Sequence, residues 1–193
     1  MAASANIGRS IESLARGIQR CRACRLHRNR THAVPGEGPS RAAVVLVGEA
    51  PGRREDETGR PFQGPAGVCL DELLAETGLR REDLFITSSV KCRPPGNRDP
   101  RPDELATCRG RWLDAQLARI DPAVVVTLGA VPARALLGET RPLQAIHGRP
   151  RERDGRIWLV AYHPAAAMRF PRARRGLRRD LKVLRGLKDN RGR

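Results

Sequence analysis

Four short apolar runs, rich in β-branched residues, constrain the fold of this 193-residue chain more than any other feature. Each run has the length of a strand buried on both faces, and segments of helical period lie between and around the runs. The runs cover 43–47, 84–87, 123–128 and 157–161. This alternation favours an α/β fold, a three-layer α/β/α sandwich around a central four-stranded parallel sheet. We expect one domain over residues 1–193.

Apolar residues at helical spacing predict the helices that cover this sheet. The predicted helices span about 7–20, 66–77, 102–120, 131–137 and 174–187. The stretch 169–193 holds 11 Arg or Lys residues against two Asp, so we expect a basic helix and tail from about residue 170. Such a charge run is either a solvated face or a surface that follows phosphates.

The overall charge narrows the class of partner. Lys and Arg number 37 against 21 acidic residues, a net charge of +16, which favours nucleic acid. A GC-rich genome would explain the preference for Arg over Lys, but not the excess of basic over acidic residues. No run approaches the roughly 18 apolar residues of a membrane span, and no signal peptide is evident. We therefore expect a cytoplasmic, monomeric protein without membrane contact.

Polar or turn residues follow each predicted strand. Glu49 lies in the turn Gly48-Glu49-Ala50-Pro51-Gly52 after the first strand, Ser88 follows the second, and His163 follows the fourth. The carboxyl ends of parallel strands meet at one edge of the sheet, where such loops build a ligand crevice. The sequence therefore predicts that Glu49, Ser88 and His163 converge on one pocket.

A proline-rich segment follows the second strand at 93–100. It is too short to separate domains. We interpret it as a rigid loop facing the active site or DNA, or as a simple crossover loop.

The five cysteines divide into four candidate ligands and one core thiol. Cys21 and Cys24 have a C-x2-C spacing, and Cys92 and Cys108 lie on either side of the proline-rich segment. Four thiolates can hold zinc or an iron–sulfur cluster, and the spacing leaves both open, beside the possibility of four unrelated thiols. Cys69 lies among apolar residues at helical spacing and is predicted to be a buried core thiol.

Taken together, these motifs resemble the family 4 (type 4) uracil-DNA glycosylases, the iron–sulfur class. The match runs from about residue 20 to 185, which is most of the chain. Its segments, in order, are Cys21-x2-Cys24, Gly48-Glu49-Ala50-Pro51-Gly52, Glu55-Asp56, Gly59-Arg60-Pro61-Phe62-Gln63-Gly64, Val90-Lys91-Cys92-Arg93-Pro94-Pro95-Gly96-Asn97-Arg98-Asp99-Pro100, Cys108 and Tyr162-His163-Pro164.

The resemblance implies a monofunctional enzyme that hydrolyses the N-glycosidic bond of uracil in single- or double-stranded DNA during base excision repair. It implies that Phe62 stacks on the flipped uracil, that Glu49 helps to place the water, and that His163 stabilises the leaving base. The turn residues Ala50, Pro51 and Gly52 are implied to contact the base as well. The resemblance also implies a [4Fe-4S] cluster; its ligands would be Cys21, Cys24, Cys92 and Cys108.

Two positions depart from the family pattern. Ser88 stands where the family usually has an Asn that reads the uracil edge, and a hydroxyl offers fewer contacts than an amide. Ser89 or Asn97 could take over that role, or Ser88 could act through a water.

The second departure is in the segment after His163-Pro164. There Met168 is a small candidate wedge for the gap left by the flipped base, and Arg169 is a candidate contact to a phosphate. Two alternatives stay open: a preference for hypoxanthine or xanthine, and a non-catalytic iron–sulfur protein that binds DNA.

Overall fold

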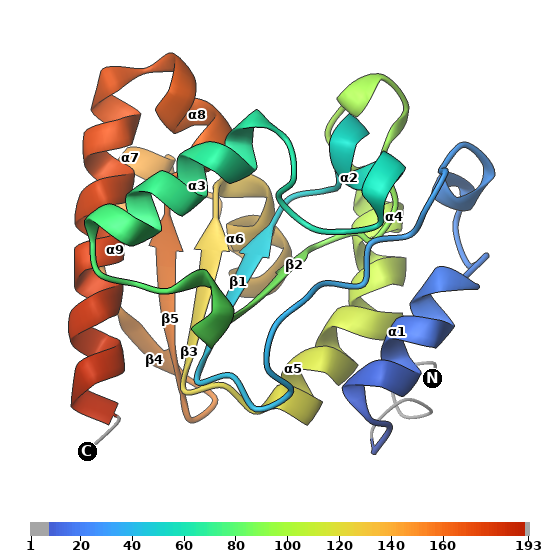
Figure 1. Ribbon diagram of the computed structural model, residues 1–193, viewed down its shortest axis with the longest axis horizontal. Coiled ribbons are helices and arrows are strands. Elements are labelled where there is room, and N and C mark those ends of the chain that lie inside the picture. The colour runs from blue at the N-terminus through green and yellow to red at the C-terminus, as the bar shows by residue number, and fades with distance from the viewer. Residues whose placement is uncertain (1–7, 192–193) are drawn as a thin grey trace.

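A five-stranded sheet forms the centre of the computed structural model, which describes residues 8–191 (Figure 1). The strand order is β2-β1-β3-β5-β4. The strands are β1 (Val44–Gly48), β2 (Leu84–Ser88), β3 (Val124–Leu128), β4 (Arg151–Arg153) and β5 (Arg156–Ala161). Strands β1, β2, β3 and β5 are parallel to one another, and the register of β1 with β2 places Gly48 beside Ser88. The predicted α/β sandwich with four parallel strands is therefore confirmed.

The predicted number of strands is wrong by one. The additional strand, β4, pairs antiparallel with β5 at the edge of the sheet. Its three residues are Arg, Glu and Arg, all exposed, so it lacks the apolar pattern that identifies a strand. Backbone pairing with β5 defines it instead.

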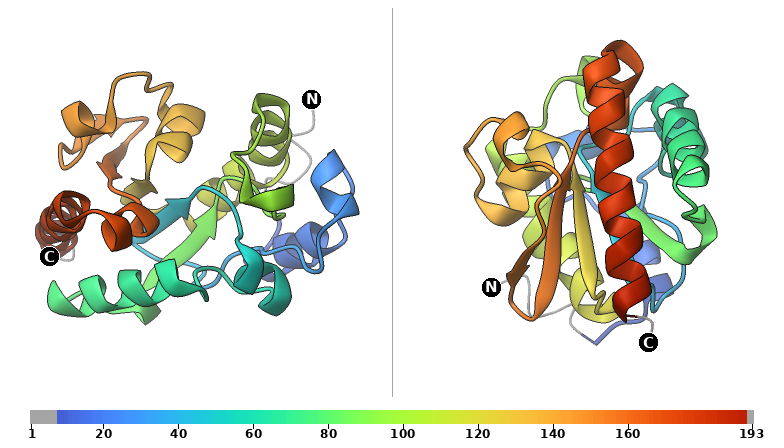
Figure 2. Two further views of the ribbon diagram at one scale, coloured as in Figure 1. Left: turned by 90° about the horizontal axis from the view of Figure 1, so that it is seen from above. Right: turned by 90° about the vertical axis from the view of Figure 1, so that its left-hand side faces the viewer.

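Helices cover both faces of the sheet (Figure 2). Helices α3, α8 and α9 pack with one face, while α5 and α6 pack with the other, and α1 packs on α5. The helices are α1 (Ile11–Gln19), α2 (Arg53–Thr58), α3 (Pro65–Glu76), α4 (Pro102–Cys108), α5 (Asp114–Ile120), α6 (Ala130–Leu137), α7 (Leu143–Ile146), α8 (Pro164–Arg169) and α9 (Pro171–Arg191). Short 3-10 turns occupy Arg25–Arg28, Arg81–Asp83 and Pro95–Asn97.

Most predicted helices have their expected places, with shifted ends. The predicted helix at 102–120 includes a π-helical turn at Arg109–Leu113 between α4 and α5. The first helix begins after Ser10, whose side chain accepts a hydrogen bond from the Ser13 N–H and caps it. Its predicted start at residue 7, and the end of the basic tail at 192–193, lie outside the described residues. Helices α2, α7 and α8 were not predicted because six residues or fewer give little periodicity.

Within the described part of the chain, no helix is both long and apolar enough to cross a membrane.

Candidate functional site

A cavity of about 370 Å³ contains most of the residues predicted for the site. It is framed by the turn after β1, the end of β2, the proline-rich loop and the start of α8. Among its lining residues are Glu49, Ala50, Pro51, Gly52, Phe62, Ser88, Asn97, His163 and Arg169. Met168 does not line it and instead lines a groove with Val68 of α3.

The aromatic wall of the cavity is Phe62, which is 9% exposed. Its φ of 52° is in the left-handed region, which is costly for a bulky residue, and such strained residues cluster at functional sites. Two glycines make room for it. A Cβ on Gly67 would lie 1.8 Å from the Phe62 carbonyl oxygen, and one on Gly48 would lie 2.7 Å from the phenyl ring.

His163 lies opposite this wall, with its ring centroid 6.0 Å from that of Phe62. Its Nδ1 accepts a hydrogen bond of 3.1 Å from the Ala165 N–H, in the first turn of α8. The neutral ring therefore carries its proton on Nε2. Burial lowers the pKa of His163 to about 4, because the charged form would lose its hydration. Near neutral pH this residue is an uncharged hydrogen-bond donor.

Glu49 is the titratable carboxylic acid of the turn after β1. Burial raises its pKa to about 7, and the negative charge of Asp99 in the proline-rich loop adds to the shift. A carboxyl group with a pKa near neutrality can change its protonation state in the working range of an enzyme.

Glu55 organises the cavity, a role that the sequence analysis did not assign to it. One carboxylate oxygen accepts hydrogen bonds of 2.7 Å from the N–H groups of Gln63 and Gly64. The other accepts one of 2.9 Å from the Gly52 N–H. Glu55 thus joins the turn after Glu49 to the segment that carries Phe62. The sequence did carry a signal for this role: Glu55 lies three residues after Gly52, and a Glu in that position completes a capping box at the start of a helix.

A different carboxylate, that of Glu104 in α4, holds the proline-rich loop. It is fully buried and accepts two hydrogen bonds from the Arg98 guanidinium, at 2.7 and 2.9 Å, and one from the Arg101 N–H. Arg98 and Asn97 of this loop line the cavity. The proline-rich segment is therefore a rigid part of the site.

Ser88, which stands where the family usually has an Asn, is 4% exposed and lines the cavity. The two residues that could replace the missing amide, Ser89 and Asn97, differ in position. The Ser89 hydroxyl is buried and donates to the Gly48 carbonyl at 3.0 Å, so it serves the backbone. Asn97 lines the cavity, but its side-chain oxygen accepts a hydrogen bond of 2.7 Å from Arg93.

The four candidate ligand cysteines pack together in one apolar cluster beside the site. The Trp112 indole N–H donates to Cys21 Sγ at 3.2 Å, and Arg30 donates to Cys92 Sγ at 3.0 Å. Burial raises the pKa of the Cys108 thiol to about 12, so its thiolate would need a compensating positive charge. Four thiols with N–H donors aimed at sulfur fit the donor set of an iron–sulfur cluster. As the described side chains lie, no group of three or more is arranged to enclose a metal ion.

Cys69 lies apart from these four, on the buried face of α3, which confirms the prediction of a core thiol.

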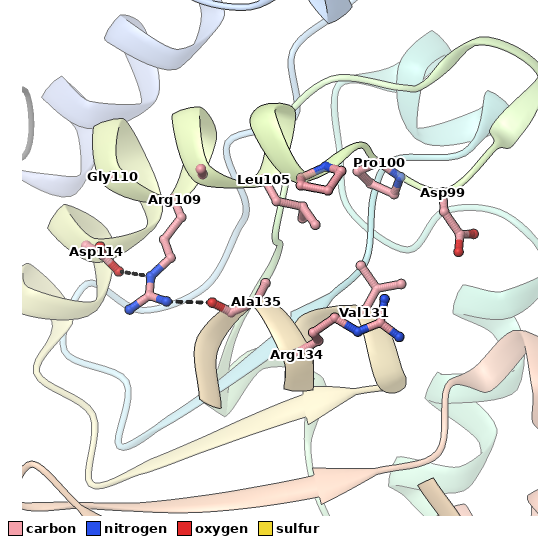
Figure 3. A pocket seen from close by; sticks show the side chains of 11 residues that line it. Asp99, Pro100, Leu105, Arg109, Gly110, Asp114, Val131, Arg134 and Ala135 are labelled. Carbon is pink, nitrogen blue, oxygen red and sulfur yellow. Dashed lines mark hydrogen bonds and ion pairs between the residues drawn. The ribbon is translucent and has the colours of Figure 1, made fainter. Parts of the chain in front are cut away.

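A cavity of about 530 Å³ lies elsewhere, between α4 and α6 (Figure 3). Arg109 crosses it and donates to Asp114 Oδ1 at 3.1 Å and to the Ala135 carbonyl at 2.5 Å. None of the residues predicted for the site lines this cavity. The cavity that contains the predicted site residues is therefore the smaller one, around Phe62 and His163.

Comparison with known proteins shows the family to which the chain belongs. Residues 35–185 match the model of the uracil DNA glycosylase superfamily. The chain is 43% identical over 183 residues to a type-4 uracil-DNA glycosylase of Archaeoglobus fulgidus, covering 91% of this chain and 92% of the relative. It is 44% identical over 161 residues to the type-4 enzyme of Thermotoga maritima, covering 82% and 83%. A type-5 uracil-DNA glycosylase of Thermus thermophilus is 39% identical over 119 residues, covering 54% and 53%.

The protein is thus a glycosylase, an enzyme of the N-glycosyl hydrolase class. The chain belongs to the uracil-DNA glycosylase superfamily, and its resemblance to the type-4 branch is confirmed.

Proposed function

We propose that this enzyme hydrolyses the N-glycosidic bond of uracil in DNA and leaves an abasic site. The observation that carries the proposal is the pairing of a buried phenyl ring with a neutral imidazole, 6.0 Å apart, in one cavity. A base can reach such a cavity only after it leaves the helical stack, and a flat apolar wall compensates for the stacking it loses. Phe62 provides that wall.

The proposed chemistry follows from how charge develops. As the glycosidic bond breaks, the sugar becomes positive and the departing uracil becomes negative. A donor fixed beside the growing negative charge lowers the barrier, because it needs no reorganisation during the reaction. The Nε2–H of His163 is such a donor, since the Ala165 N–H holds its Nδ1 as the acceptor. We assign it to a carbonyl oxygen of uracil.

Glu49 is proposed to orient the water that attacks the sugar. A positively charged sugar needs only a weak nucleophile, so orientation by a carboxylate is sufficient. Because the pKa of Glu49 is about 7, this carboxyl group is protonated below that pH and ionised above it.

This assignment predicts a pH profile for excision. The single-turnover rate should rise with pH up to about 7 and then level, because the ionised Glu49 is the active form. The profile of Glu49→Gln should be flat and low in this range, because His163, with a pKa of about 4, stays neutral there. A wild-type rate that falls as pH rises through 7 would contradict the role given to Glu49.

Base preference is the finer part of the proposal, and Ser88 decides it. Oligonucleotides with uracil, hypoxanthine or xanthine, treated with the enzyme and then with alkali, should be cleaved mainly at uracil. Ser88→Asn should raise the uracil rate severalfold, since an amide both donates to and accepts from the base edge. Cleavage mainly at a purine would move the assignment to the alternative specificity. An unchanged rate in Ser88→Asn would mean that this pocket reads the base through other groups.

We further propose that the four clustered cysteines hold a [4Fe-4S] cluster, which supplies a structural link between the segment after α1 and the loop after β2. Anaerobically purified protein should be brown and contain about four irons per chain. Cys92→Ser should lower the iron content, whereas Cys69→Ala should retain it, because Cys69 lies in the separate α3 core. Zinc in place of iron in the wild-type protein would overturn this part.

A further inference from the structure

The corner between α8 and α9 exposes apolar side chains that the proposed reaction does not use. Residues 168–172 are exposed without interruption, and Phe170 is 61% and Met168 49% exposed. Among the described large hydrophobic residues, only Val68, at 58%, is comparably exposed. The corner lies at the end of the molecule towards which the parallel strands run (Figure 1).

The backbone of this corner is well anchored. The Phe170 N–H donates to the Ala166 carbonyl at 2.9 Å, and the Phe170 carbonyl accepts from the Arg174 N–H at 3.1 Å. These bonds join the end of one helix to the first turn of the next. The phenyl group is therefore presented to solvent from a fixed backbone position.

This exposed surface is continuous with the candidate active site. Arg169, the residue before Phe170, lines the cavity around His163. Met168 and Val68 line a neighbouring groove of about 610 Å³. At the start of α3, Ala66 lines the cavity and Pro65 lines the groove, so the two hollows share a rim.

The charges at the corner complement a polyanion. On the side of α9 that faces α3, Arg174 pairs with Glu72 at 3.1 Å and Arg178 pairs with Glu76 at 2.7 Å. By contrast, three exposed arginines have no carboxylate within ion-pair distance among the described residues: Arg169, Arg172 and Arg175. Positive charge beside Phe170 is thus left for an external partner such as phosphate.

We propose that Phe170 stacks on the unpaired base next to the flipped uracil in single-stranded DNA, while Arg172 and Arg175 contact the adjoining phosphates. The inference rests on the proposed excision of uracil. Aromatic rings accept any base face, and such stacking contributes substantially to single-strand binding. In a duplex, the neighbouring base keeps its partner and its stack, so Phe170 gains less there. We call this exposed ring of Phe170 the stacking platform. It therefore favours uracil in single-stranded DNA over uracil in a duplex.

The test uses a short single strand that carries 2′-fluoro-deoxyuridine, whose fluorine slows cleavage by opposing positive charge on the sugar. The fluorescent base 2-aminopurine is placed on one side of it or the other. Wild-type protein should quench the fluorescence at one of these two positions. Phe170→Ala should lose the quenching and weaken single-strand binding roughly tenfold, with less than threefold change for a U·G duplex. Phe170→Trp should keep both properties, and Phe170→Leu, apolar but without a ring, should lose the quenching.

A matched pair of arginines tests the charge component. Arg172→Ala should reduce the slope of log affinity against log salt by about one, whereas Arg178→Ala, whose partner is Glu76, should leave the slope nearly unchanged.

Three outcomes would contradict the proposal. If the wild type excises uracil but Phe170→Ala retains both the quenching and the single-strand affinity, only the stacking platform is overturned. Absence of excision by the wild type would overturn the proposed function as well. Wild-type dimers that become monomers in Phe170→Ala, with DNA binding unchanged, would assign the corner to a second copy of the chain and overturn the proposal.

Discussion

His163→Ala is expected to lower the single-turnover rate of uracil excision about 100- to 1,000-fold, the usual loss when one donor to a developing anion is removed. The rate falls because the negative charge of the departing base loses its fixed partner. Substrate binding should change much less, since this donor acts mainly as the bond breaks. Rapid-quench measurements at saturating enzyme separate the two effects.

Two controls sharpen this result. His163→Gln places an amide donor near the same position and should recover part of the lost rate. A thermal melt should show that His163→Ala remains folded. A His163→Ala protein with a wild-type rate would contradict the assignment of the leaving-group donor.

Glu55→Gln is expected to lower both stability and activity, because this side chain joins two backbone segments of the cavity. The carboxylate accepts three backbone N–H bonds, from Gly52, Gln63 and Gly64. A glutamine loses the charge and turns an N–H₂ group towards at least one of these donors. Leaving charge-assisted bonds unmade should cost about 2–4 kcal/mol of unfolding free energy, and displacement of Phe62 should lower excision at least tenfold.

The matched control is Glu57→Gln, on the same short helix. Glu57 pairs with the exposed arginines Arg53 and Arg54, and such surface pairs contribute little to stability. Its melting temperature and excision rate should stay near those of the wild type. If Glu55→Gln behaved like Glu57→Gln, the view that Glu55 shapes the pocket would be wrong.

The parallel part of the sheet could be predicted because its strands are buried on both faces, so that their sequences are mostly apolar. Because the carboxyl ends of parallel strands meet at one edge of a sheet, that topology alone predicted that the turn after β1, Ser88 and His163 lie in one pocket. Strand β4 could not be predicted in the same way, since its exposed residues carry no hydrophobic pattern. The π-helical turn in the long helical segment likewise leaves no clear mark on the spacing.

The finer geometry of the site depended on contacts between distant segments. The left-handed backbone of Phe62 requires that Gly67, five residues later, has no side chain, and the phenyl ring fits only because Gly48, at the end of β1, has none either. The hydrogen bonds that Glu55 accepts from the N–H groups of Gln63 and Gly64 exist only when the two loops meet. Asn97 has a side chain that could read a base, yet its oxygen accepts a hydrogen bond from Arg93. From the sequence we could name Phe62, Glu55 and Asn97, but not the groups that each of them contacts.

The central claim is that the cavity around Phe62 and His163 releases uracil from DNA by hydrolysis. The most direct measurement incubates the protein in ¹⁸O-labelled water with a uracil-containing single strand, and then identifies both products by mass spectrometry. The account predicts free uracil without label and an intact strand whose abasic sugar carries one ¹⁸O atom. An intact uracil-containing strand, or a strand broken at the phosphate while uracil stays on its sugar, would contradict it.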